Sequence, residues 1–196
     1  MKFFTKEELG AILLVLGSII LVSTPNYVVS LRRARDAQRK ADLGSIHSAL
    51  AKYQEDFGTF PLVKDGAIAA CAPYEVVRKN TRKPDGSPDV TVNYSACNWG
   101  RDSLVDLSDP SYPPYLKAIP NDPQAQHGLK YVYFSNGSRF QVYAALEGKS
   151  EDEYDKEIIK RGINCGTKIC NFGRAYGKTP LNKSIEQYES ELLKLK

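Results

Sequence analysis

The fold of this chain is decided by residues 9–22, which read LGAILLVLGSIILV and are apolar almost throughout. No charged residue occurs between Leu9 and Leu31. As a helix, residues 9–31 extend roughly 34 Å, which is enough to cross the hydrocarbon core of a bilayer. The sequence therefore predicts a transmembrane helix over residues 4–31.

A cleaved secretory signal peptide is the alternative interpretation of the apolar stretch. Lys2 and Lys6 supply the positive start that such a signal needs. The apolar stretch is long, however, and no Ala-x-Ala cleavage site follows it. The pattern favours an anchor that stays attached to the chain.

The predicted helix extends well beyond the membrane. Thr5, followed three residues later by Glu8, has the pattern of a helix capping box. Residues 32–58 are predicted to form an amphipathic half of the same helix, which ends at Gly58. Its apolar face consists of Leu43, Ile46, Leu50, Tyr53 and Phe57.

Residues 59–196 are predicted to form a globular head. Residues 90–94, 129–134 and 139–146 read as strands, and the last two flank Asn136-Gly137, a two-residue hairpin signal in which both positions favour positive φ. A small antiparallel sheet packed on the amphipathic half of the helix would bury the apolar faces of both. The expected fold class is therefore α+β.

A second helix is predicted over residues 179–196. Thr179 and Pro180 fit a cap and a first helical position. We expect this helix to dock on its own head, and docking on a neighbouring subunit is the alternative. Its apolar stripe consists of Leu181, Ile185, Tyr188, Leu192 and Leu195.

The four cysteines all follow the apolar segment, and an even number there suits disulfides in an oxidising compartment. We expect the sequence-nearest pairs, Cys71–Cys97 and Cys165–Cys170. Zinc is the competing interpretation, because four residues separate Cys165 from Cys170, which is close to ligand spacing.

The net charge is +4, and much of it lies in Arg32, Arg33, Arg35, Arg39 and Lys40. A basic stretch beside a membrane segment predicts solvated contact with lipid headgroups, and nucleic-acid binding is not needed to explain it. The positive-inside rule would place the head in the cytoplasm, whereas the cysteines favour the outside. We favour the outside, with the basic residues paired to neighbouring acids.

The N-terminus resembles type IV pilins, in which Phe-Thr and two further residues lead to an acidic residue and an apolar helix. Residues 4–9 read FTKEEL. Further likeness, to the major pseudopilin of type II secretion, lies in residues 35–43, 53–61, 115–123 and 131–133. The resemblance covers residues 4–61 and 109–147, and places neither 62–108 nor 148–196. Phe3 departs from the family, which carries glycine before its cleavage point.

The resemblance implies a leader of residues 1–3, removed by a prepilin peptidase between Phe3 and Phe4, and a methylated amine on Phe4. Glu8 would pair with the N-terminal amine of a neighbouring subunit and set the axial register; the alternative is that it only completes the cap. Gly17 and Pro25 fall where the family carries residues that loosen the helix during assembly, and a plain proline kink is the alternative.

The resemblance also implies a non-enzymatic subunit of a homopolymeric pilus or pseudopilus. Such a subunit waits in the inner or cytoplasmic membrane and then enters a filament outside the cytoplasm, built by the pilus assembly machinery. The alternative is a monomeric, membrane-tethered binding protein or enzyme. Calcium is a candidate ligand for Asp106, Asp109 and Asp122, which are otherwise turn aspartates. No other cofactor is expected.

Overall fold

The computed structural model describes residues 5–82, 88–109 and 111–194, and for residues 22, 23, 25, 77–82 and 88–91 it describes the backbone alone. The predicted leader, the cleavage position Phe3–Phe4 and the last residue of the C-terminal stripe, Leu195, lie outside the described residues.

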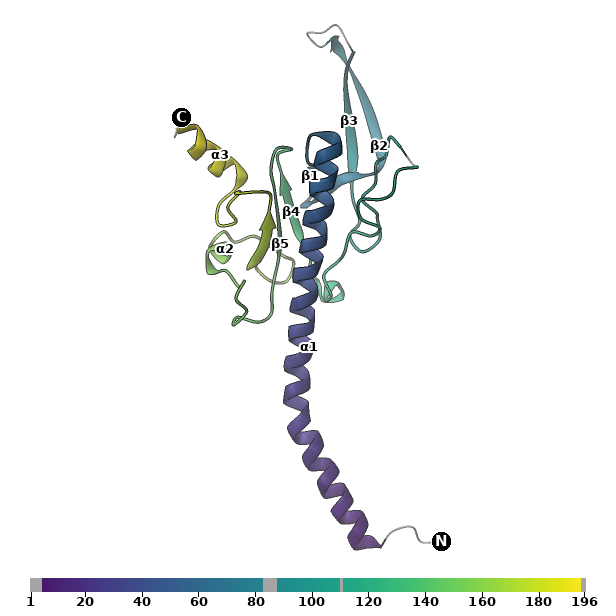
Figure 1. Ribbon diagram of the computed structural model, residues 1–196, viewed down its shortest axis with the longest axis vertical. Coiled ribbons are helices and arrows are strands. Elements are labelled where there is room, and N and C mark those ends of the chain that lie inside the picture. The colour runs from purple at the N-terminus through teal and green to yellow at the C-terminus, as the bar shows by residue number, and fades with distance from the viewer. Residues whose placement is uncertain (1–4, 83–87, 110, 195–196) are drawn as a thin grey trace.

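One helix, α1 (Lys6–Phe57), forms the long axis of the molecule, and the head lies beside its upper half (Figure 1). The capping box predicted at its start is present: the Glu8 amide donates to the Thr5 hydroxyl at 3.3 Å, and the Thr5 amide donates to the Glu8 carboxylate at 2.8 Å. The helix ends at Gly58, whose φ of 72° is unfavourable for residues with a side chain. Both predicted helix ends are therefore confirmed.

The head contains two antiparallel sheets, where the sequence predicted one. The first has the order β1 (Leu62–Lys64), β2 (Ala67–Arg82) and β3 (Pro88–Ala96). The second has the order β4 (Val132–Ser135), β5 (Phe140–Ala144) and β6 (Phe172–Ala175). A single-turn 3-10 helix, η1 (Ala125–His127), and the short helix α2 (Lys156–Lys160) lie in the connections.

The two-residue hairpin turn lies at a different place from the one that the sequence predicted. Asp65-Gly66 joins β1 to β2, and both residues have positive φ, so this pair is the two-residue turn. Asn136-Gly137 instead lies in a four-residue loop, because Ser135 pairs with Phe140. Only Gly137 has positive φ there, and the Asn136 side chain accepts hydrogen bonds from the amides of Ser138 and Arg139.

The predicted apolar face of α1 packs on the second sheet and forms the core. Leu43, Ile46 and Leu50 are at most 1% exposed. They share one cluster with Tyr133 and Phe140 of the hairpin. Burying each large side chain contributes roughly 1.5–3 kcal/mol, so this face attaches the head to the helix. Phe57, the last residue of the predicted face, is 38% exposed and lies outside the core.

The C-terminal helix is shorter than predicted. α3 comprises Ile185–Lys194, and it begins after Ser184, whose hydroxyl accepts from the Gln187 amide while the Gln187 side chain accepts from the Ser184 amide. Thr179 is not the cap; it is buried and accepts a hydrogen bond from Arg139. The competing capping box at Ser184 therefore sets the start of α3.

The segment before α3 docks on its own head. The Gln141 side chain donates to the carbonyls of Pro180 and Lys183, and the Tyr143 hydroxyl donates to the carbonyl of Leu181. Ile185 is buried against the head. The contacts agree with the expected self-docking, but they are made by residues 179–185 more than by the helix that follows.

Both predicted disulfides are present. Cys71–Cys97 closes a separation of 26 residues and links β2 to the end of β3. Cys165–Cys170 closes a separation of five residues in the connection between α2 and β6. All four cysteines are thereby used, and zinc ligation by them is ruled out in this state.

Candidate functional site

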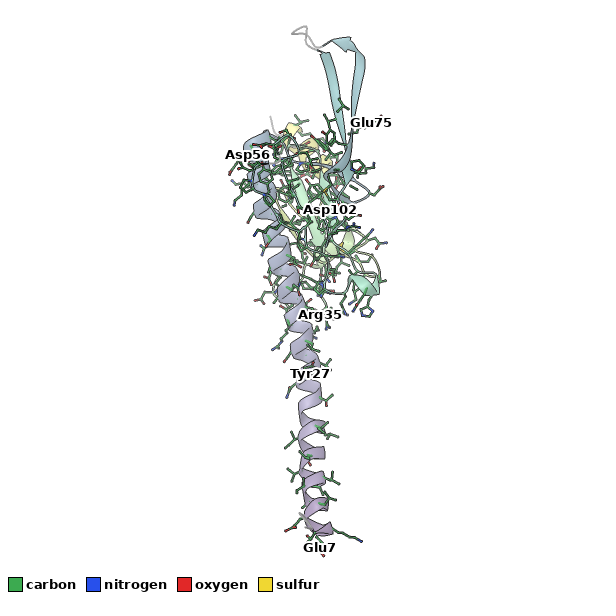
Figure 2. The ribbon with its side chains drawn as sticks, turned by 90° about the vertical axis from the view of Figure 1, so that its right-hand side faces the viewer. Glu7, Tyr27, Arg35, Asp56, Glu75 and Asp102 are labelled. Carbon is green, nitrogen blue, oxygen red and sulfur yellow. A yellow bond between two sulfur atoms is a disulfide. The ribbon has the colours of Figure 1, made fainter. Side chains whose placement is uncertain are left out.

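Most of the exposed large apolar side chains that the structure describes lie on the lower half of α1, which the head does not cover. Every side chain described from Thr5 to Leu31 is exposed. Figure 2 shows Glu7 and Tyr27 on the part of the helix that stands free, and Arg35 where the head begins. The large apolar side chains exposed there are Leu9, Ile12, Leu13, Leu14, Val15, Leu16, Ile19, Ile20, Leu21, Tyr27, Val28, Val29 and Leu31.

This half of the helix is suited to an environment without water. It is apolar around its whole circumference, which is typical of helices surrounded by lipid or by other helices. Two of its hydroxyl groups are satisfied internally, because Ser18 donates to the Leu14 carbonyl and Thr24 to the Ile20 carbonyl. By length and composition α1 can cross a membrane, a property that membrane anchors share with signal sequences.

Gly17 leaves a shallow groove on the apolar half, lined also by Ile20, Leu21, Thr24 and Val28. A Cβ atom at Gly17 would meet no atom within 4 Å. The fold of one subunit therefore does not require glycine here, whereas close packing of a second helix against this position would require it.

The helix is continuous through Gly17 and Pro25. Because proline has no backbone N–H, Pro25 cannot donate to the carbonyl of Leu21. This part of α1 therefore has one backbone hydrogen bond fewer than a regular helix. Local unwinding during assembly, which was expected from the resemblance, stays a prediction about the assembled state.

Glu8 lies at the exposed start of α1. Its Oε2 atom accepts from the Thr5 amide and, at 3.0 Å, from the Thr5 hydroxyl. Among the described residues, Oε1 has no hydrogen-bond partner within the chain. The single subunit thus forms the cap, and an oxygen remains that can accept from a cationic group of a second chain.

A buried ion cluster joins α1 to the head where the apolar half ends. At its centre is Arg39, whose side chain is 0% exposed. Its five N–H groups make five hydrogen bonds of 2.8–3.0 Å: two to Asp122, and one each to Asp36, Glu147 and Gln124. Every donor of the guanidinium is therefore satisfied.

The acids of the cluster also bind groups other than Arg39. Asp36 also accepts from the backbone amides of Glu147 and Gly148, and Arg35 binds Glu147 through two bonds of 2.7 Å. The hydrogen bonds from Arg35 and Arg39 lower the pKa of Glu147 to about 2. Burial acts to lower the pKa of Arg39, but the bonds with Asp122, Glu147 and Asp36 raise it overall. Arg39 and Glu147 are therefore both charged at any physiological pH.

The prediction of a solvated basic stretch is therefore wrong for three of its five residues. Arg35 and Arg39 bind the cluster, and Lys40 pairs with Glu151 at 2.8 Å and with Glu153 at 2.5 Å. The expected pairing with neighbouring acids holds for Asp36. Asp42 instead accepts a hydrogen bond from the Tyr131 hydroxyl, and burial raises the pKa of Asp42.

The three aspartates considered for calcium do not form one site. Asp106 and Asp109 each accept from a serine two residues later and so shape turns, whereas Asp122 is buried against Arg39. Within the described ranges, no group of three His, Cys, Asp or Glu residues is placed to hold a metal. No sequence pattern predicted that Asp122 and Glu147, far apart in the chain, meet at Arg39.

Comparison with protein-family models, curated proteins and solved structures gives no match.

Proposed function

We propose that this chain is a structural subunit of a pilus-like or pseudopilus-like filament, held in a membrane before assembly and polymerised through α1. One observation carries the proposal: the apolar half of α1 is uncovered over its whole length and continues without a break into the half that carries the head. A plain anchor would need only the first of these features.

In this proposal, the lower halves of α1 leave the lipid during assembly and pack against one another. They are apolar around their circumference, so a bundle of them forms an interior that excludes water. Gly17 provides a place where a second helix approaches closely, since nothing in the subunit fills the space beside it. The head is then carried on the outside of the bundle.

Glu8 would set the axial register of the bundle. A carboxylate drawn into an apolar interior costs a few kcal/mol unless it is paired. The N-terminal amine of a neighbouring chain, at Phe4 after removal of the leader 1–3, is the natural partner. Only one stagger of two parallel helices brings these charges together, so the pairing selects that stagger.

The ion cluster supports the proposal because a polymer needs heads in a fixed position. Arg39 is 0% exposed and binds acids from α1 and from two separate segments of the head. This arrangement stops the head from sliding along or rotating about the helix. Each subunit then presents the same head surfaces to its neighbours.

The adjacent glutamates provide a matched test. Both Glu7 and Glu8 are exposed in the first turn, but only Glu8 takes part in the capping box. We expect Glu8→Ala to insert into the membrane and to form far fewer filaments, as counted by electron microscopy of sheared cells, while Glu7→Ala assembles normally. Glu8→Gln keeps an acceptor for the cap but removes the charge. If this variant also fails to assemble, the defect comes from the lost charge that sets the register and not from the lost cap.

The test also distinguishes the alternative function. If the unsubstituted chain stays monomeric in membranes under all conditions, a tethered binding protein or enzyme is the better conclusion. Mass spectrometry of the mature N-terminus checks the remaining parts of the proposal: cleavage by a prepilin peptidase between Phe3 and Phe4, and methylation of Phe4.

A further inference from the structure

A ribbon of two strands projects from the head beyond the end of α1 (Figures 1 and 2). β1 pairs only with the start of β2, up to Ala69, so from Tyr74 onward β2 is paired with β3 alone. A two-stranded ribbon is marginal in water unless one face packs on something. This ribbon is therefore expected to find a partner surface.

One face of the ribbon is apolar. Tyr74 pairs with Tyr94 and Val76 with Val92, and residues two apart in a strand share a face. Tyr74, Val76 and Val92 are between 38% and 50% exposed. The rings of Tyr74 and Tyr94 lie 5.9 Å apart, so the four side chains form one continuous patch.

A groove of about 590 Å³ continues this patch at the foot of the ribbon. Val92 and Tyr94 belong to both, and Leu62, which is 61% exposed, lines the groove from β1. Lys64 and Glu75 give its lining one cation and one anion. The groove is thus an apolar recess with a charge of each sign.

The free end of α3 has complementary chemistry. Leu193 is 73% exposed, although it belongs to a regular helix. Lys194 lies beside it and is exposed, whereas Glu191 in the same turn is bound by Lys183 of its own chain at 2.7 Å. α3 projects on the opposite side of α1 from the ribbon, so a chain does not place its own Leu193 in its own groove (Figure 1).

We propose that the groove and ribbon face receive the last turn of α3 from a second copy of the chain, with Leu193 as the side chain that enters. Lys194 then faces Glu75. Because the two surfaces lie on opposite flanks of one molecule, the contact is head-to-tail and repeats without limit, as in an open filament. This inference rests on the proposed filament and adds a lateral contact between heads.

Photo-crosslinking in assembled filaments tests the contact directly. With benzoylphenylalanine in place of Leu193, we expect cross-linked dimers whose second peptide contains residues 62–64, 74–76 or 92–94. The same chain kept monomeric in detergent should give no dimer. Cross-links to the chain's own head, or to another surface of the neighbour, would overturn the inference.

Two exposed apolar residues provide the matched variants. Val92 and Ile169 are 38% and 43% exposed, but Ile169 lies outside the ribbon and the groove. Val92→Glu should reduce filament yield roughly tenfold or more, because it brings an unpaired charge to the apolar contact. Ile169→Glu should have little effect, and both variants should melt like the unsubstituted chain. Normal filaments from Val92→Glu refute this contact alone, whereas a chain that never polymerises refutes the proposed function.

Discussion

Replacing Arg39 with alanine tests whether the buried ion cluster holds the head on α1. The substitution removes five hydrogen bonds and leaves the carboxylates of Asp36 and Asp122, both with 0% exposed side chains, without their cation. Removing one partner of a buried ion pair costs about 3–5 kcal/mol, because the other charge stays buried. For a chain of this size, that corresponds to a fall in melting temperature of about 6–20 °C.

The assay is thermal unfolding of the full chain in detergent micelles, followed by near-ultraviolet circular dichroism of the head's aromatic residues. Arg33→Ala is the control, because Arg33 is exposed in the same stretch of helix and should change stability by only about 0.5 kcal/mol. Arg39→Lys should fall between the two, since lysine keeps the charge but cannot reproduce the two-bond contact with Asp122. A melting temperature for Arg39→Ala equal to that of Arg33→Ala would refute the reasoning.

Three further predictions concern the head. Folding lowers the pKa of Glu147 from 4.5 to about 2, so the ionised Glu147 stabilises the fold fully above pH 4.5, and this stabilisation is lost as the pH falls toward 2. The stabilisation amounts to at most roughly 3 kcal/mol. Glu147→Gln should therefore flatten this part of the curve of melting temperature against pH. Removing the disulfide with the 26-residue separation should cost about 3.5 kcal/mol and the five-residue one about 2 kcal/mol, measured by denaturant unfolding of the two double-serine variants; equal losses would contradict the loop-entropy argument. Deleting residues 179–196 should lower the melting temperature markedly, because it leaves the buried Gln141 amide without its two carbonyl acceptors, and unchanged stability would instead assign the tail to contacts between subunits.

The sequence predicts α1 well because each of its signals is local. The capping pair Thr5 and Glu8, the apolar periodicity and Gly58 all act within a few residues, so they can be interpreted without knowing the rest of the fold. The disulfide pairs were predicted for a similar reason, since short loops cost less entropy to close. Asp65-Gly66, the turn between β1 and β2, carries an equally local signal that the prediction overlooked.

The ion cluster could not be predicted because its members are far apart in the chain. Arg39 meets Asp122 and Glu147 across separations of 83 and 108 residues, and only the folded head brings them together. Charge patterning along one helix instead indicated a solvated stretch. The start of α3 was misplaced because two plausible caps, Thr179 and Ser184, compete, and burial of Thr179 against the head decides between them.

The continuity of α1 has a mechanical consequence for a fibre made of such subunits. Its 52 residues form a rod about 78 Å long, and the head packs against the side of this rod without interrupting it. A pulling force along the fibre would therefore pass from helix to helix, while the sheets, the disulfides and the ion cluster carry little of it. Breaking strength would depend on the contacts of the apolar halves, with the stretch near Pro25 yielding first. Outside the groove, the ribbon face and the last turn of α3, the head is then free to change its surface without weakening the fibre.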